Sequence, residues 1–205
     1  MSSARVGVVD YGRGNLRSVS KALEASGART ALVTGPAEIA GLDALVVPGV
    51  GCFGDCAANL QATGLWAPLR EWIASGRPYL GICLGYQLLF EGSEESPGVP
   101  GLGVIPGQVV RFSSGAGRKV PHMGWNQLCD LRGPLYDRIP EATAAYFVHS
   151  YYPQPADPEL ASATCEYGGL FAASVSRDAL HATQFHPEKS QAAGLAILRN
   201  FLKIL

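Results

Sequence analysis

Apolar residues follow two alternating patterns through the first half of the chain. Short, nearly uninterrupted apolar runs predict buried strands at 5–10, 30–33, 44–47 and 79–82. Apolar residues at helical spacing predict helices at 15–25, 56–75 and 84–90. Gly27 should end the first helix, Gly64 and Pro68 should interrupt the second, and Pro48-Gly49 should break the third strand. Strands that alternate with helices predict an α/β fold with a largely parallel central sheet.

The pattern changes from about residue 100 onward. Glycine and proline become frequent, and short strands are expected at 102–105, 108–112, 145–149, 161–166, 170–175 and 180–185. This half of the chain should therefore add antiparallel strands, and residues 191–205 should close it as an amphipathic helix. No linker, repeat or low-complexity tract interrupts the sequence, so residues 1–205 are expected to form one domain.

Composition and charge exclude several classes of protein. Apolar residues make up 47% of the 205 residues and charged residues 16%, which is not the composition of a disordered chain. The net charge is -1, so we expect no nucleic-acid binding and no attraction to an anionic membrane. The stretch MSSARVGVVDYG has no signal-peptide pattern, and no apolar run reaches the roughly 18 residues of a membrane span. We therefore expect a cytoplasmic protein.

The cysteines and the first glycine-rich turn give no sign of a metal or cofactor. Five cysteines, at 52, 56, 83, 129 and 165, are an odd number without the spacing of a disulfide framework, so free thiols are expected. No Cys/His pairs stand at zinc-ligand spacing. The turn Y-G-R-G-N at 11–15 lacks the third glycine of a dinucleotide fingerprint, because Arg17 stands there. A tight turn with Asn15 near a helix N-cap is the simpler interpretation.

The stretch G-I-C-L-G at 81–85 joins a predicted strand to a predicted helix. It has the form of a nucleophile elbow with cysteine in place of serine. The thiol of Cys83 would project above the sheet at a helix N-terminus, where the helix dipole favours a thiolate. A lone cysteine is more often a buried structural residue, but the flanking glycines favour the nucleophile. The N–H of Leu84 and a loop N–H at Val50 or Gly51, in P-G-V-G (48–51), would then form an oxyanion hole.

A nucleophilic thiol needs a base, and the base needs an orienting group. His186 and Glu188 stand two residues apart in Q-F-H-P-E, where Pro187 keeps the segment out of a helix, so both side chains can project the same way. The sequence therefore predicts a Cys83–His186–Glu188 triad. By themselves, a surface turn explains H-P-E, and hydrogen-bonded, partly buried side chains explain His122, His149 and His181.

Six segments match motifs of one known family, in order and across nearly the whole chain. They are D-Y-G-R-G-N-L-R-S-V (10–19), P-G-V-G-C-F (48–53), G-I-C-L-G-Y-Q-L-L-F-E-G-S-E-E (81–95), P-H-M-G-W-N (121–126), Y-F-V-H-S-Y (146–151) and Q-F-H-P-E-K-S (184–190). With them the chain resembles class I glutamine amidotransferases, and within that class the glutaminase subunits of imidazole glycerol phosphate synthase. G-x-C-x-G and H-P-E indicate only the class, whereas D-Y-G-x-G-N, P-H-M-G-W-N and V-H-S-Y indicate the subunit.

The resemblance implies a fold, an activity and a set of glutamine-binding residues. The fold would be the three-layer α/β fold of the class. Cys83 would attack the side-chain amide of glutamine, His186 would move the proton, and Glu188 would orient His186. Gly51, Gln87, His149 and Ser150 would help to bind glutamine.

The resemblance also implies a partner. Ammonia would pass to a (β/α)8-barrel cyclase subunit in a 1:1 heterodimer, which makes imidazole glycerol phosphate and an aminoimidazole carboxamide ribonucleotide in histidine biosynthesis. Asn15, Trp125 and Tyr146 would face this partner, although both aromatic residues are equally compatible with a place in the core. The P-G-V-G segment would reorient when the partner binds nucleotide, so the isolated subunit would be nearly inactive.

Two residues near the expected site depart from the simple pattern. Tyr86 stands where the family usually has Met, which affects the expected packing near glutamine, and Cys52 is a second candidate for a reactive thiol. Two other functions remain open: a glutaminase that serves another acceptor, such as pyridoxal phosphate synthesis, and a non-catalytic regulatory module. The first would lack D-Y-G-x-G-N and P-H-M-G-W-N, and the second would tolerate loss of the triad.

Overall fold

The structure is a computed structural model that describes residues 3–113, 115 and 119–205. Residues 1–2, the beginning of the stretch without a signal-peptide pattern, lie outside the described residues. A seven-stranded sheet forms the centre, with the strand order β10-β11-β12-β4-β3-β1-β2. Its strands are β1 (Arg5–Val9), β2 (Arg29–Val33), β3 (Ala44–Gly49), β4 (Tyr79–Cys83), β10 (Ala161–Glu166), β11 (Leu170–Arg177) and β12 (Leu180–Thr183).

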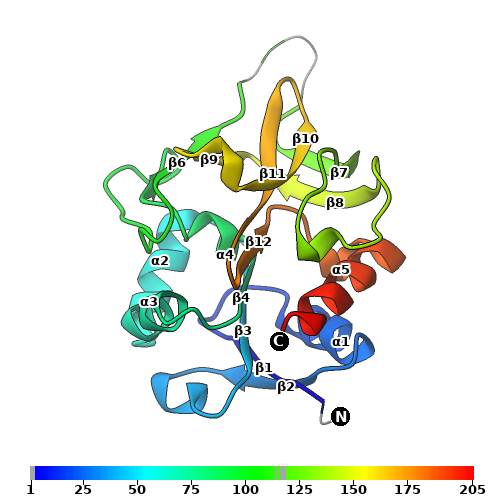
Figure 1. Ribbon diagram of the computed structural model, residues 1–205. Coiled ribbons are helices and arrows are strands. Elements are labelled where there is room, and N and C mark those ends of the chain that lie inside the picture. The colour runs from blue at the N-terminus through cyan, green and yellow to red at the C-terminus, as the bar shows by residue number, and fades with distance from the viewer. Residues whose placement is uncertain (1–2, 114, 116–118) are drawn as a thin grey trace.

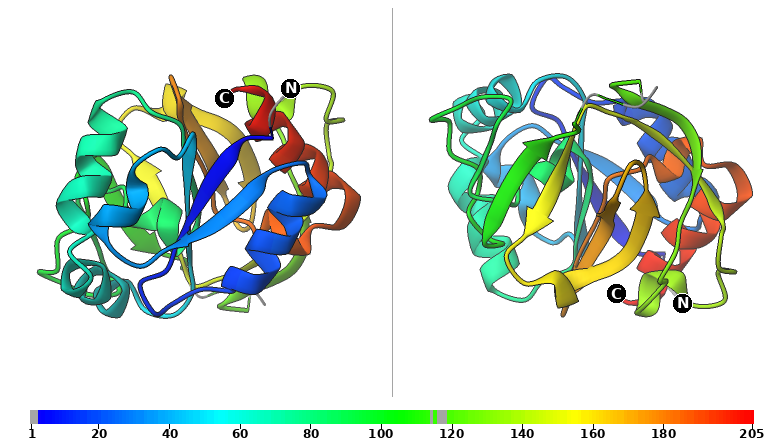
Figure 2. Two further views of the ribbon diagram at one scale, coloured as in Figure 1. Left: turned by 90° about the horizontal axis from the view of Figure 1, so that it is seen from below. Right: turned by 90° about the horizontal axis from the view of Figure 1, so that it is seen from above.

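Helices cover both faces of this sheet. α1 (Leu16–Ala25) and α5 (Gln191–Lys203) lie on one face, while α2 (Phe53–Ala62) and α3 (Trp66–Ala74) lie on the other (Figures 1 and 2). The strands of the sheet centre are buried on both faces: every residue of β3 and β4 is buried. This arrangement of helices on both sides of a mostly parallel sheet confirms the predicted α/β fold. Both faces of such a sheet are apolar, and helices on each side bury them.

The pairing within the sheet follows the predicted change between the two halves of the chain. β2, β1, β3, β4 and β12 pair in parallel, and β11 runs antiparallel between β12 and β10. In β3, Pro48 and Gly49 pair in register with Ile82 and Cys83 of β4. The expectation that Pro48-Gly49 breaks the strand is therefore wrong, and this pairing brings the P-G-V-G segment beside the elbow.

Two small sheets extend the molecule beyond the carboxyl ends of the parallel strands (Figure 1). One contains β5 (Gly92–Ser93), β6 (Gly107–Arg111) and β9 (Tyr151–Pro155), and the other pairs β7 (His122–Gln127) with β8 (Ala144–His149). The sequence pattern predicted β6 and β8 but missed β5, β7 and β9. In β7 the apolar residues Met123 and Trp125 alternate outward instead of inward, so their pattern does not indicate a core.

Three predicted elements differ from the structure. Residues 102–105 form no strand, because their backbone N–H groups donate to carbonyls of Leu88, Leu89 and Phe90 instead. The helix expected at 84–90 is α4 (Leu84–Gln87), which continues only as tighter turns. Pro68 does not interrupt a helix, since it lies in the first turn of α3, where a missing N–H costs no intrahelical bond.

Short 3-10 turns connect several of these elements: η1 (Pro36–Ile39), η2 (Pro134–Tyr136), η3 (Pro158–Leu160) and η4 (Pro187–Lys189).

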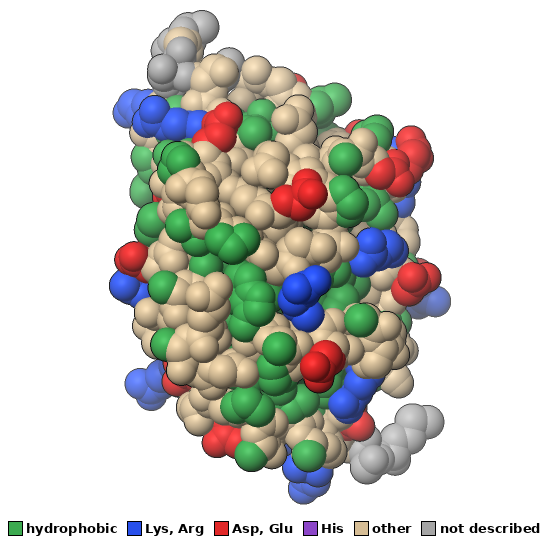
Figure 3. Space-filling model, turned by 90° about the vertical axis from the view of Figure 1, so that its left-hand side faces the viewer, with side chains coloured by type: hydrophobic (Ala, Val, Ile, Leu, Met, Phe, Trp, Pro, Cys, Tyr) green, Lys and Arg blue, Asp and Glu red, His purple; other side chains and the backbone are tan. Residues whose placement is uncertain are grey.

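The face that carries α2 and α3 shows side chains of both charges interspersed with apolar ones, without a continuous basic patch (Figure 3). No helix in the described part of the chain combines the length and the apolar character needed to cross a membrane.

Candidate active site

Cys83 ends β4, and the next residue begins α4, so the thiol lies at a sharp strand-to-helix turn. Its backbone is in the left-handed region, with φ 55°, a conformation that costs energy in a residue other than glycine. A Cβ at Gly81 would lie 2.6 Å from the carbonyl oxygen of Gly85, and a Cβ at Gly85 would overlap the carbonyl oxygen of Val47. Both glycines are therefore required by close backbone approach, and the turn has the geometry of a nucleophile elbow.

His186 and Glu188 form a buried pair beside this turn. His186 Nδ1 lies 2.8 Å from Glu188 Oε1, and the side chains are 2% and 1% exposed. Burial alone would lower the pKa of His186, but the charge of Cys83, followed by the hydrogen bond and charge of Glu188, raises this pKa to about 10. These surroundings therefore favour the protonated imidazolium form of His186.

The second nitrogen of His186 has no hydrogen-bond partner among the described residues. Cys83 raises the pKa of His186 through its charge, yet no hydrogen bond between the two side chains has acceptable geometry. Catalytic hydrogen bonds are often long without substrate and tighten in the reacting complex. Nε2 is therefore the ring atom available to exchange a proton.

A cavity of about 300 Å³ opens beside Cys83. Eight residues that the sequence predicted for the site line it: Val50, Gly51, Cys83, Leu84, Gln87, His149, Ser150 and His186. The remaining lining residues are Glu95, Val148, Tyr151 and Lys189, which the sequence analysis did not name. Glu188 lies behind His186 and does not line the cavity. The predicted residues therefore come together at one place from four separate segments of the chain.

The P-G-V-G segment is held on its inner side. Tyr11 Oη donates to the carbonyl of Pro48 at 2.8 Å, and Cys56 Sγ lies 3.6 Å from the carbonyl oxygen of Val50. Because the peptide unit is planar and trans, the N–H of Gly51 points to the opposite side from that carbonyl. Gly51 has φ 103°, which favours glycine. These contacts leave the Gly51 N–H directed away from Cys56 and α2.

A buried polar network surrounds the predicted glutamine-binding residues. Gln87 Nε2 donates to the carbonyl of Tyr151 at 3.0 Å and to Gln184 Oε1 at 3.1 Å. His149 Nδ1 donates to the same Tyr151 carbonyl at 2.8 Å, and burial lowers the pKa of His149 to about 3. His149 is therefore neutral at physiological pH, and the Oε1 atom of Gln87 has no partner among the described residues.

Glu95 and Lys189 are the charged residues that sequence reasoning missed. Glu95 accepts a hydrogen bond from the N–H of Phe53, the first residue of α2, at 2.7 Å, and it also lines the cavity. Lys189 lies with its Nζ 5.7 Å from the ring centre of Tyr146. Both stand inside the quoted motifs G-S-E-E and H-P-E-K-S, so their proximity to the site motifs was the signal that could have identified them.

The comparisons with known proteins agree with this geometry. Residues 7–205 match the family described as "Glutamine amidotransferase class-I". The chain belongs to this family. This amidotransferase is 50% identical to the imidazole glycerol phosphate synthase subunit HisH of Syntrophotalea carbinolica, over 95% of this chain and 97% of that protein. It is 49% identical to the protein of the same name from Thermosynechococcus vestitus, over 100% of this chain and 99% of that protein.

Solved structures show the same fold at lower identity. A crystal structure of a glutamine amidotransferase matches this amidotransferase with a TM-score of 0.77 and 23% identity, over 97% of each chain. The structure of PurLQS from Thermotoga maritima matches with a TM-score of 0.79 and 18% identity, over 98% of this chain and 99% of that one. These likenesses support the three-layer fold alone.

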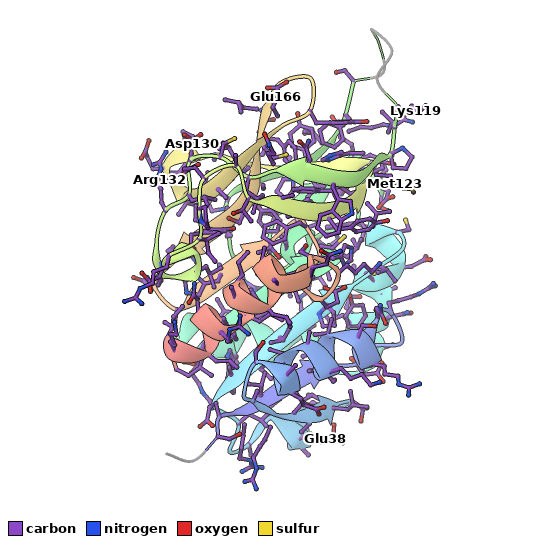
Figure 4. The ribbon with its side chains drawn as sticks, turned by 90° about the vertical axis from the view of Figure 1, so that its right-hand side faces the viewer. Glu38, Lys119, Met123, Asp130, Arg132 and Glu166 are labelled. Atoms are coloured by element: carbon purple, nitrogen blue, oxygen red, sulfur yellow. The ribbon has the colours of Figure 1, made fainter. Side chains whose placement is uncertain are left out.

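The three predicted interface residues of the amidotransferase occupy different settings. Trp125 is 49% exposed on β7, and its ring packs edge-on against Tyr146 of β8 with centroids 5.9 Å apart. Met123, which the sequence analysis did not select, is 62% exposed on the same strand, where Figure 4 labels it. Asn15 stands at the N-cap of α1 as predicted, but its side chain makes no capping bond.

The other singled-out residues of the amidotransferase lie away from the cavity. Tyr86 is fully buried and packs against Phe90, so it does not line the site that its departure from the family was expected to affect. Cys52 Sγ lies 3.5 Å from Ser96 Oγ, outside the cavity. His181 lies 2.9 Å from the hydroxyl of Ser176, as expected for a buried histidine. Within residues 3–113, 115 and 119–205, no group of three or more His, Cys, Asp or Glu side chains is arranged to hold a metal ion.

Proposed function

We propose that this chain hydrolyses glutamine to glutamate and ammonia, with Cys83 as nucleophile, His186 as acid–base and Glu188 as the group that orients His186. The observation that carries the proposal is the buried 2.8 Å contact between His186 and Glu188, beside a cysteine held at a strained elbow in a cavity. The proposal assigns this activity to a single glutaminase domain over residues 1–205.

The chemistry follows from the charges of the pair. The Cys83 thiolate attacks the side-chain amide carbon of glutamine, and the developing oxyanion accepts hydrogen bonds from backbone N–H groups. The C–N bond then breaks as the His186 imidazolium gives its proton to the departing ammonia. Water attacks the thioester while His186 removes a proton from it, the C–S bond breaks, and glutamate leaves with Cys83 again a thiolate.

The cavity residues supply the binding roles. The N–H groups of Leu84 and of Gly51, or of the adjacent Val50, are the proposed oxyanion donors, since these residues line the cavity beside Cys83. Gln87 offers its free Oε1 to a substrate N–H.

The amino-acid end of glutamine meets different groups. His149 and Ser150 line the same cavity. Glu95 is the one Asp or Glu among the lining residues, so its carboxylate is suited to the α-ammonium group of glutamine.

The names of the relatives imply a second subunit, because each is a subunit of a synthase. We propose that ammonia passes to a (β/α)8-barrel cyclase subunit in a 1:1 heterodimer, for the synthesis of imidazole glycerol phosphate and aminoimidazole carboxamide ribonucleotide in histidine biosynthesis. Trp125, Tyr146 and Asn15 are the proposed contacts, together with Met123, which extends the exposed apolar face of β7. Val148, which pairs with Met123, lines the cavity, so this face borders the site.

The cellular setting is part of the same proposal. All five cysteines are free, which suits the reducing cytoplasm. Fractionation of cells that express the chain tests this location.

Glutamate release from glutamine tests the function. Wild type and Cys83→Ala are assayed alone and with the cyclase subunit loaded with its ribonucleotide. We expect release that requires Cys83 and the loaded partner. Release that requires Cys83 but ignores the partner would support a glutaminase for another acceptor. No release under any condition would support the regulatory module instead.

A further inference from the structure

Gln184 is a buried residue to which the proposed mechanism gives no role. It follows β12 in the Q-F-H-P-E segment and is completely buried. Its side-chain Nε2 lies 3.6 Å from Cys83 Sγ, within hydrogen-bonding reach of a sulfur atom. An amide nitrogen can only donate, so the sulfur of Cys83 must be the acceptor.

The orientation of the Gln184 amide is fixed by an atom that cannot change its role. The carbonyl of Tyr151 only accepts hydrogen bonds, so the atom of Gln87 that lies 3.0 Å from it must be the nitrogen. The same nitrogen donates to Gln184 at 3.1 Å, which requires the oxygen of Gln184 on that side. The nitrogen of Gln184 must then face Cys83. Reversing this amide would set two N–H groups against each other and an oxygen against the sulfur.

A second donor occupies the Tyr151 carbonyl. His149 Nδ1 donates to it at 2.8 Å, which leaves His149 Nε2 to accept from His122 Nδ1 at 3.1 Å. Asn126 Nδ2 in turn lies 3.2 Å from His122 Nε2. Both histidines are buried, so their rings have little freedom to rotate. These contacts hold the Tyr151 carbonyl in place and with it the amide of Gln87.

We propose that Gln184 is a positioning residue that holds the sulfur of Cys83 and favours its thiolate form. A neutral thiol is a weak acceptor, so an amide N–H placed against it gains little. A thiolate is an anionic acceptor, and hydrogen bonds to charged groups are about twice as strong as neutral ones. In a dry site this difference is larger still. The arrangement therefore stabilises Cys83 most when the sulfur is charged. The proposal depends on the proposed function in one respect only, which is that glutamine hydrolysis uses this thiolate.

The test is the pH dependence of iodoacetamide alkylation of Cys83, followed by mass spectrometry of its peptide in the full chain. Gln184→Met keeps the length and removes both hydrogen-bonding atoms. We expect its alkylation midpoint to rise by about one pH unit relative to wild type, the equivalent of one hydrogen bond to a charged group. Gln87→Met frees the Gln184 amide to reverse, so its midpoint should rise in the same direction by less. Gln184→Glu, which keeps the shape and sets a carboxylate against the sulfur, serves if Gln184→Met does not fold, and should raise the midpoint further.

A matched variant distinguishes a specific effect of Gln184 on Cys83 from the general effect of losing a buried amide. Asn200 is also buried and donates to the carbonyls of Leu135 and Asp137, away from Cys83. Asn200→Leu should lower stability without moving the midpoint. An unchanged midpoint in Gln184→Met, or an equal shift in Asn200→Leu, would overturn the proposal. The readout needs no glutamine, so failure of the glutaminase function would appear separately, as absent glutamate release by wild type with its partner.

Discussion

Replacing Glu188 by Gln removes one negative charge while the side chain keeps its shape. Glu188 Oε1 accepts from His186 Nδ1 at 2.8 Å, and neither side chain is more than 2% exposed. Two unit charges about 4 Å apart interact by roughly 4 kcal/mol at an effective dielectric constant near 20. The amide oxygen of Gln retains a neutral hydrogen bond worth about 1 kcal/mol. We therefore expect kcat to fall by about 10²-fold, since 1.36 kcal/mol corresponds to a factor of ten.

The sign of the pH effect follows from the same pair. In the proposed mechanism His186 must be an imidazolium to protonate ammonia, and Glu188 is one of the groups that raise the pKa of His186 to about 10. Without the carboxylate this pKa falls, so the alkaline limb of the kcat/KM profile should move to lower pH by about one to two units. The assay is glutamate release from about pH 6 to about pH 10.5 with the loaded partner, a range that spans the ordinary pKa of histidine and the raised pKa of His186.

Glu95→Gln provides the control. It removes a carboxylate from the same cavity, but Glu95 bonds to the Phe53 N–H and makes no bond to His186. This variant should raise KM and leave the alkaline limb in place. An alkaline limb that does not move in Glu188→Gln, or one that moves equally in both variants, would refute the reasoning.

Three further predictions concern the elbow, the partner and acid stability. Gly85→Ala should prevent folding or lower the free energy of unfolding by more than about 3 kcal/mol, because the added Cβ would overlap the Val47 carbonyl. Gly35 has open space and an extended backbone, so Gly35→Ala should leave the free energy of unfolding nearly unchanged. Urea unfolding measures both. Trp125→Ala should weaken partner binding about 30-fold by calorimetry, and Leu32→Ala, an exposed apolar residue of β2, should not change the Kd. Burial lowers the pKa of His181 to about 4, so its neutral form stabilises the fold above pH ~6.5 and this contribution is lost as pH falls through 4. His181→Gln should therefore lose less stability than wild type between pH 7 and pH 4 in urea titrations, by an amount on the order of 3 kcal/mol; equal losses would contradict the assignment.

Local sequence patterns predicted the centre of the fold and failed at its edges. The strand that ends at Cys83 is a pure apolar run buried on both faces, so periodicity and burial agree there. The segment 102–105 is equally apolar, yet its N–H groups bond to the turns after α4, a distant contact that no local pattern encodes. In β7 the outward Met123 and Trp125 depart from the usual inward placement, and only their 62% and 49% exposure identifies the surface.

The candidate site was predictable where a short motif contains the proposed catalytic residue. G-x-C-x-G and H-P-E indicated Cys83, His186 and Glu188, and the structure brings these segments together. Glu95 and Gln184 were missed although both stand within quoted motifs, because a carboxylate or amide in a sequence does not reveal what it contacts. Glu95 meets the N-terminus of α2, and Gln184 meets Cys83 and Gln87, so both sets of contacts arise from tertiary packing.

The backbone carbonyl of Tyr151 orients two side chains of the site, a role that does not depend on which side chain stands at position 151. This oxygen accepts hydrogen bonds from both His149 and Gln87, and every residue type has the same oxygen in the same place. The residue type at position 151 can therefore change while the oxygen that orients His149 and Gln87 is retained. A change at position 152 or 153 that rotates this peptide would move the acceptor of both hydrogen bonds. In engineered variants of β9, keeping the backbone conformation at this peptide is therefore more important than keeping the tyrosine side chain.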